Sequence, residues 1–212
     1  MPLAALRTVV TLVAALVLAL PAAVAHATPA SDVVTSLNSS IIRIMQNAKT
    51  LGYKGRYKEF EPILTRTFDM PFMAERSIGR KWAELSPAQK NKVIDTFRRY
   101  TTALYASRFD SYSNQKFEIV GERANPNENG ATVVRNQFID SKGKIVNIDY
   151  VVRTVSGRSM AFDVYLNGSI SEVAVRRSEF ATIVNNQGVD ALVAQIEQRI
   201  AAVEEESIKK GG

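Results

Sequence analysis

Apolar positions in the first part of the chain recur at helical spacing. Between residues 31 and 48 they return every three or four positions, which predicts an amphipathic helix. Gly52 and Gly55 are expected to end this helix. A second helix is predicted over residues 57–68, and an aspartate–methionine–proline step then opens a third, over residues 69–84.

The strongest local signal is the segment Ser86-Pro87-Ala88-Gln89. Serine at the cap, proline at the first helical position and glutamine at the third form a capping box with a preset backbone angle. A long helix is therefore predicted from this point to about residue 110. Its broad apolar stripe includes Phe97, Tyr100, Leu104 and Tyr105.

After Ser111 the apolar period changes to two, which is typical of strands with one buried face. Four strands are predicted, separated by turns rich in asparagine and glycine that suit hairpins. Asn167-Gly168 implies a fifth strand, and helices are predicted again over residues 176–186 and 189–207. The apolar positions of the four strands are Phe117 and Ile119; Val134 and Phe138; Val146, Ile148, Tyr150 and Val152; and Met160, Phe162, Val164 and Leu166.

Helices, then a meander, then helices again predict an α+β domain. We expect an antiparallel meander sheet of four to five strands with one face covered by helices. The sequence contains no internal repeat, and no low-complexity linker divides it. Residues 28–212 are therefore expected to form a single domain.

The first 27 residues have the pattern of a cleaved secretory signal peptide. Arg7 precedes an apolar run from Val9 to Leu20, and the small residues that follow end in Ala25-His26-Ala27, an alanine–x–alanine cleavage pattern. The apolar run has 12 residues, whereas a membrane-spanning helix needs about 20. The sequence thus predicts cleavage after Ala27 and export to the bacterial periplasm.

Composition narrows the chemistry. The only histidine is His26, inside the predicted signal peptide, and there is no cysteine. A Ser-His-Asp triad, a cysteine nucleophile and an ordinary zinc or copper site lack their residues, so we expect neither a catalytic nor a metal site. Phosphate-binding loops, calcium loops and dinucleotide fingerprints are also missing, and no cofactor is predicted.

The basic residues are spread along the chain. The formal net charge is +6 at pH 7, but no block of lysine or arginine stands out. Nucleic acid is therefore not expected as a partner. We interpret the mildly basic surface as a solubility feature, with attraction to anionic lipid headgroups as the alternative.

Two strand carboxylates, Asp149 and Asp163, could in principle serve acid–base chemistry. Alternation places both opposite the main apolar face, where surface or hairpin ion pairs explain them. Ser169 and Ser171 lack the Ser-x-x-Lys or Gly-x-Ser-x-Gly spacing of a nucleophile. Binding is therefore predicted ahead of catalysis.

Seven short segments stand in a specific order along the chain: Phe68–Ala74 (FDMPFMA), Ile78–Trp82 (IGRKW), Leu85–Gln89 (LSPAQ), Phe97–Tyr100 (FRRY), Tyr105-Ala106, Asp163–Ser171 (DVYLNGSIS) and Arg177–Phe180 (RSEF). This set resembles the MlaC family of periplasmic phospholipid-binding proteins, also called toluene-tolerance proteins. Met160-Ala161-Phe162 departs from the tryptophan that often opens this strand in the family, and Glu172–Arg177 (EVAVRR) is similar to the hopanoid-associated, HpnM-like members. The cargo is thus open between a phospholipid and a hopanoid-type lipid.

The resemblance implies a soluble carrier that holds lipid tails in an apolar cavity between sheet and helices. It also implies two partners, an outer-membrane lipoprotein complex and an inner-membrane ABC transporter with a lipid-binding subunit, between which the carrier shuttles lipid to maintain membrane asymmetry. No cofactor besides the bound lipid is implied. The residues predicted to bind lipid are Phe72, Phe97, Tyr100, Leu104, Tyr105, Val146, Ile148, Tyr150, Val152, Phe162, Val164 and Leu166.

Apolar periodicity alone does not distinguish a cavity from an ordinary close-packed core. An exported interaction scaffold without a lipid cavity therefore stays open as an alternative function. A small envelope esterase is a third interpretation.

Overall fold

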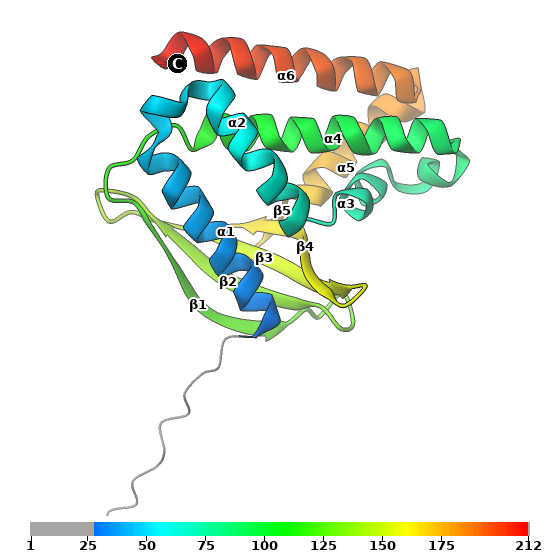
Figure 1. Ribbon diagram of the computed structural model, residues 1–212. Helices are drawn as coiled ribbons and strands as arrows, with labels where there is room; N and C mark the ends of the chain where they lie inside the picture. The colour runs from blue at the N-terminus through cyan, green and yellow to red at the C-terminus, as the bar shows by residue number, and fades with distance from the viewer. Residues whose placement is uncertain (1–27, 212) are drawn as a thin grey trace, which may run out of the picture.

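The computed structural model describes residues 28–211, so the predicted signal peptide lies outside the described residues. The described part contains six α-helices, one 3₁₀ helix and a five-stranded antiparallel sheet. The helices lie on one side of the sheet (Figure 1). The predicted α+β class, with a meander sheet covered on one face, is confirmed.

The two N-terminal helices, α1 (Pro29–Gln46) and α2 (Ala48–Thr67), are separated by one residue. The chain kinks at Gly52, whose φ of 59° is readily adopted by glycine. The predicted break at Gly55 is wrong, because Gly55 lies within helical backbone. A Cβ atom there would lie 2.9 Å from the Cβ of Leu51, so this glycine allows a close approach within the helix.

The predicted caps of the next helices are confirmed. α3 (Met70–Ile78) begins with the Asp69 carboxylate accepting a 3.3 Å hydrogen bond from the backbone N–H of Phe72. It gives way at Gly79 to a 3₁₀ helix, η1 (Gly79–Glu84). α4 (Pro87–Arg108) opens on the complete capping box, with reciprocal hydrogen bonds between Ser86 and Gln89.

The sheet follows the predicted meander, in the order β1-β2-β3-β4-β5 with every neighbouring pair antiparallel. The turn between the last two strands is Asn167-Gly168, with φ of 51° and 75°, as in the primed hairpin turns. The strands are β1 (Lys116–Ala124), β2 (Thr132–Ile139), β3 (Ile145–Val155), β4 (Arg158–Leu166) and β5 (Ile170–Ser171).

One irregularity in β4 affects the site. Val151 pairs with Asp163 and Val152 pairs with Ala161, which leaves Phe162 without a partner in β3. Such a β-bulge breaks the alternation of side chains between the two faces. Residues on either side of Phe162 therefore do not keep the faces that a period of two predicts.

The helix α5 (Glu172–Gln187) starts four residues earlier than predicted, because β5 is only two residues long. Ser171 caps it by accepting from the backbone N–H of Ala174 at 2.9 Å. The Asp163 carboxylate accepts from the backbone N–H of Val173 at 3.1 Å and from the Ser171 hydroxyl at 2.5 Å. These contacts fix the first turn of α5 to β4.

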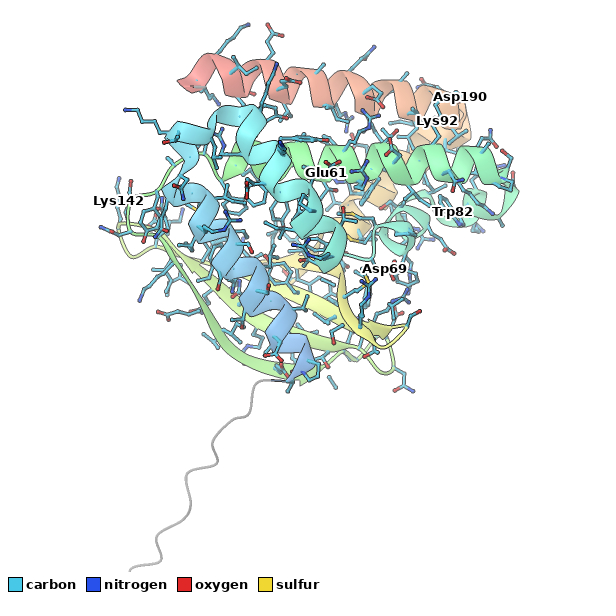
Figure 2. The ribbon with its side chains drawn as sticks, viewed as in Figure 1. Glu61, Asp69, Trp82, Lys92, Lys142 and Asp190 are labelled. Carbon is cyan, nitrogen blue, oxygen red and sulfur yellow. The ribbon has the colours of Figure 1, made fainter. Side chains whose placement is uncertain are left out.

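The last helix, α6 (Val189–Gly211), forms an outer layer over α4, as Figure 1 shows. Lys92 of α4 lies 3.1 Å from the carboxylate of Asp190 at the start of α6 (Figure 2). Arg99 of α4 pairs with Glu197 further along α6. No helix within residues 28–211 is long and apolar enough to cross a bilayer.

Candidate functional site

A cavity of about 310 Å³ lies between α4 and the sheet face that the helices cover. Small-molecule sites in proteins have volumes of roughly 300–1,000 Å³, so this cavity lies at the lower end of that range. Its lining residues are Met45, Phe68, Met73, Phe97, Thr101, Leu104, Tyr105, Arg108, Phe109, Ser111, Gln115, Phe138, Ile148, Tyr150, Val164, Leu166, Glu172, Val173 and Arg176.

The sheet wall is built from cross-strand pairs. Tyr150 pairs with Val164, and Ile148 pairs with Leu166. Directly paired residues of antiparallel strands project from the same face, so these four side chains form one continuous apolar surface. Phe138 of β2 extends the surface on the side of β1.

The opposite wall is a stripe on α4. Phe97, Thr101, Leu104, Tyr105 and Arg108 follow one another at spacings of one, three or four residues, which places them along one side of the helix. The hydroxyl of Thr101 donates to the carbonyl of Phe97 at 2.9 Å, so it brings no unpaired donor into the cavity. The stripe is apolar for most of its length and ends in a cation.

The lining residues are segregated by polarity. Met45, Phe68, Met73, Phe97 and Tyr150 are buried and form an apolar interior. The charged and amide side chains come from the end of α4, the segment that follows it, and the first turns of α5: they are Arg108, Gln115, Glu172 and Arg176. The cavity is therefore apolar inside and polar along one rim.

Two tyrosines mark the inner wall. Burial raises the pKa of Tyr105 to about 12, and burial raises the pKa of Tyr150 well above its usual range. Both phenols are therefore neutral at physiological pH. Both tyrosines also line the cavity.

Seven of the twelve residues predicted to bind lipid line this cavity. They are Phe97, Leu104, Tyr105, Ile148, Tyr150, Val164 and Leu166. The other five, Phe72, Tyr100, Val146, Val152 and Phe162, lie elsewhere. The structure thus brings seven of the predicted residues together around one cavity and places the other five outside its lining.

The β-bulge explains where Phe162 lies. Its ring packs edge-on against Phe72, with 5.3 Å between the ring centroids. The guanidinium of Arg153 lies 3.5 Å from the centre of the Phe72 ring and 2.7 Å from the carboxylate of Asp69. Phe162 lines a separate hollow of about 210 Å³, which also contains Asp163.

The remaining three residues are displaced for simpler reasons. Tyr100 is buried beneath the guanidinium of Arg176, 4.7 Å from its ring centre. Val152 pairs with Ala161 beyond the bulge and is buried in the core. Val146 pairs with Phe138, and at that position only Phe138 reaches the cavity.

The sequence reasoning missed several lining residues. Met45, Phe68 and Met73 come from three different helices or their ends, and no local pattern brings them to the same place. Arg108 could have been found, since it lies three and four residues after Tyr105 and Leu104 on the same helical stripe. Arg176 lies in a segment for which the sequence predicted a helix but no site.

The sequence analysis expected the strand carboxylates to lie on the solvent-facing side of the sheet. This expectation is wrong, because both carboxylates are buried. Asp149 and Asp163 are both only 8% exposed. Asp149 accepts from the backbone N–H of Asn136, and Asp163 accepts from two backbone N–H groups and from Ser171. Desolvation raises the pKa of Asp163, whereas these hydrogen bonds oppose the shift. Its geometry is that of a helix anchor.

A larger hollow, of about 670 Å³, lies between α3, η1 and α5. Four of its ten lining residues are charged, namely Arg80, Lys81, Glu84 and Arg177, and its one large apolar side chain is Ile78. We therefore place the candidate site in the smaller cavity. Within residues 28–211 no group of three acidic, histidine or cysteine side chains is arranged to hold a metal ion.

Comparison with known families agrees with this architecture. Residues 35–198 match the family model described as MlaC protein. The chain belongs to the MlaC family. A relative from Haemophilus influenzae, the intermembrane phospholipid transport system binding protein MlaC, is 24% identical over 132 residues, which is 61% of this chain. The match spans 61% of that relative's own length.

A solved structure shares the fold. It is the phospholipid-binding protein from Ralstonia solanacearum in complex with a phospholipid, determined at 1.53 Å resolution. The two structures superpose with a TM-score of 0.72 at 19% sequence identity, over 82% of this chain and 98% of that one. At this level of identity, the superposition shows that the architecture is common to both proteins.

Proposed function

We propose that this protein is a periplasmic lipid carrier that holds the tails of a phospholipid in the cavity between α4 and the sheet. The observation that carries the proposal is the segregation of the lining, with an apolar interior and a charged rim. A ligand with an apolar tail and a polar head matches this arrangement. A fully polar ligand would leave the aromatic and aliphatic walls unpaired, and a fully apolar one would leave the rim charges unused.

Membership of the MlaC family supports the same function, since the Haemophilus influenzae relative is named as a phospholipid transport binding protein. The solved structure of similar fold holds a phospholipid. By this analogy, the carrier receives lipid from one membrane complex and delivers it to another across the periplasm. A phospholipid is favoured over a hopanoid-type lipid because both relatives are named for phospholipid.

The energetics suit a shuttle. Burial of a methylene group contributes about 0.8 kcal/mol, so one long acyl chain contributes on the order of 10 kcal/mol before the entropic costs of binding. This free energy is enough to compete with burial of the chain in a bilayer only when the cavity walls shield most of the acyl chain from water. Delivery then requires the cavity to open at a partner.

An esterase would need an activated nucleophile in the cavity. The hydroxyl of Ser171 donates to Asp163 and accepts from the backbone N–H of Ala174, so both of its hydrogen-bonding roles are used at the start of α5. Ser171 is not part of the cavity lining. We therefore propose a carrier in which no covalent chemistry takes place.

The proposal is tested by purifying the protein from a periplasmic extract under native conditions. Organic extraction and mass spectrometry then identify bound lipid and its stoichiometry. Near-stoichiometric phospholipid is expected, and a hopanoid in its place would change the cargo but keep the carrier. A protein that carries no lipid and takes none from vesicles would favour the interaction scaffold.

A further inference from the structure

We infer that Arg176 of α5, assisted by Arg108 of α4, binds the phosphate of the cargo at the rim of the cavity and selects phosphate-bearing lipids over neutral ones. This inference rests on the proposed function, because it assigns the headgroup position of the same site. Both arginines line the cavity, and each comes from a different helix.

Arg176 is held in place by its neighbours. Its guanidinium lies 4.7 Å from the centre of the Tyr100 ring, and one of its terminal nitrogens lies 3.9 Å from the carboxylate of Glu172, one helical turn earlier. The side chain is only 16% exposed. A cation stacked on an aromatic ring loses little further rotational freedom when it binds a ligand.

The contact with Glu172 leaves Arg176 able to bind another anion. At 3.9 Å it is too long for a hydrogen bond, so the planar fork of N–H donors is not occupied by that carboxylate. Arginine presents five such donors, in a geometry that matches the paired oxygens of phosphate. The charged rim therefore has donors that none of its own acceptors satisfies.

Arg108 adds a second positive charge to the lining of the cavity. It stands in the last turn of α4, at the end of the lining stripe, and makes no ion pair with the acidic side chains of residues 28–211. The rim thus combines two arginines with one glutamate, and it favours an anion.

The backbone at the start of α5 is not the anion site. The N–H groups of Val173 and Ala174 already donate to Asp163 and Ser171. The arginine side chains are therefore the groups that a ligand phosphate would meet. A diacylglycerol or a hopanoid without phosphate would use the same apolar walls but leave this positive charge unpaired.

The test compares two lipids with identical acyl chains, a phosphatidylglycerol and a diacylglycerol, of which only the first carries a phosphate. Delipidated protein is equilibrated with neutral carrier vesicles that contain one or the other, and the lipid bound to the re-isolated protein is measured. The variants are Arg176→Gln, Arg108→Gln and the double variant. Arg177→Gln is the matched control, since Arg177 is the next residue on α5 but lines the larger hollow and not the cavity.

Hydrogen bonds to charged groups contribute about 1.5–3 kcal/mol, so loss of Arg176 is expected to weaken phosphatidylglycerol binding about tenfold to a hundredfold. Diacylglycerol binding should stay the same, and Arg177→Gln should change neither. Equal losses for both lipids in Arg176→Gln, or equal effects of Arg176→Gln and Arg177→Gln, would overturn the assignment.

A separate binding measurement uses inorganic phosphate and glycerol phosphate in place of the two lipids. The inference expects them to bind much more weakly than the phospholipid, because they lack tails for the apolar wall. If they bind as tightly as the lipid and Arg176→Gln removes that binding, the site serves soluble phosphates and the lipid assignment is overturned. A wild-type protein that takes up neither lipid contradicts the proposed function itself, whatever the arginines do.

Discussion

The side-chain amide of Asn38 in α1 donates a 2.8 Å hydrogen bond to the amide oxygen of Asn136 in β2. Both residues are buried, at 8% and 0% exposure. Asn136 precedes the lining residue Phe138 by two positions, so its side chain lies on the same face of the sheet. This single polar contact joins the helix that crosses the sheet to the strand that extends the cavity wall.

The pair is expected to be energetically coupled. Asn38→Ala removes the partner of a buried amide, and a buried polar group without a partner costs about 1–3 kcal/mol of unfolding free energy. The double variant Asn38→Ala with Asn136→Ala should cost less than the sum of the two single variants, because no orphaned amide remains. Urea unfolding of the four proteins measures the coupling.

Asn186→Ala, at an exposed position of α5, is the control for this cycle and is expected to change stability little. Strict additivity of the two core substitutions would show that the hydrogen bond contributes nothing beyond its separate side chains.

A charge in the cavity wall should block lipid uptake. Ile148→Glu places a carboxylate on the apolar sheet face opposite α4, where an acyl chain would have to desolvate it. Uptake from vesicles is expected to fall at least tenfold. Ile145→Glu is the matched control, since Ile145 lies on the same strand but is 52% exposed and outside the lining.

Circular dichroism and thermal melting of both proteins show whether each variant is folded. Normal uptake by a folded Ile148→Glu protein would remove this residue from the binding wall.

Bound lipid should stabilise the fold. A ligand present at about 100 times its dissociation constant adds about 2.7 kcal/mol to the free energy of unfolding. For a chain of this size each kcal/mol raises Tm by about 2–4 °C, so reloading the delipidated protein should raise Tm by about 5–10 °C. Differential scanning calorimetry before and after reloading measures the shift, and an unchanged Tm would argue for an ordinary packed core.

The buried carboxyl of Asp163 should make stability depend on pH. Burial raises the pKa of Asp163, so the ionised form is disfavoured in the folded protein. The contribution of Asp163 to the free energy of unfolding is therefore greatest below the pKa of the unfolded chain, near 3.9. It decreases as pH rises through the higher pKa of the folded protein. Wild-type stability relative to Asp163→Asn should decrease as pH rises from about 4 toward neutrality.

The turn residue Asp140 is expected to show a pH dependence of stability opposite in sign to that of Asp163. The backbone N–H groups of Lys144 and Lys142 donate to its carboxylate and lower its pKa. The contribution of Asp140 to stability is therefore fully present above its unfolded pKa, near 3.9, and is lost as pH falls below it. Wild-type stability relative to Asp140→Asn should increase as pH rises toward about 4 and then stay level. Urea midpoints of the three proteins at several pH values test both signs. Parallel curves for wild type and Asp163→Asn would contradict the raised pKa.

Local signals in the sequence predicted most of the fold. The reciprocal Ser86–Gln89 cap and the Asn167-Gly168 turn are chemical patterns within a few residues of each other, and both are present in the structure. Gly55 was misleading because glycine serves both to end a helix and to allow close packing inside one. Which role applies depends on Leu51 in three dimensions.

The site was harder to predict than the fold for a similar reason. Alternation predicts a strand face correctly until a bulge intervenes, and nothing in the local pattern marks Phe162 as the extra residue. The rim arginines resemble solvated residues in sequence. Only the tertiary structure shows that Arg176 lies over Tyr100 and beside the cavity.

The bulge at Phe162 also divides the sheet along its length. On one side, Val164 and Leu166 are half-buried and open into the cavity. On the other, Ala161 is fully buried, and it accepts a 2.8 Å hydrogen bond from the backbone N–H of Asp69, next to the lining residue Phe68. The part of β4 that lines the cavity therefore ends at the bulge, with Val164 as its last member. If the cavity holds an acyl chain, as proposed, this boundary is expected to set how far the chain can extend along β4.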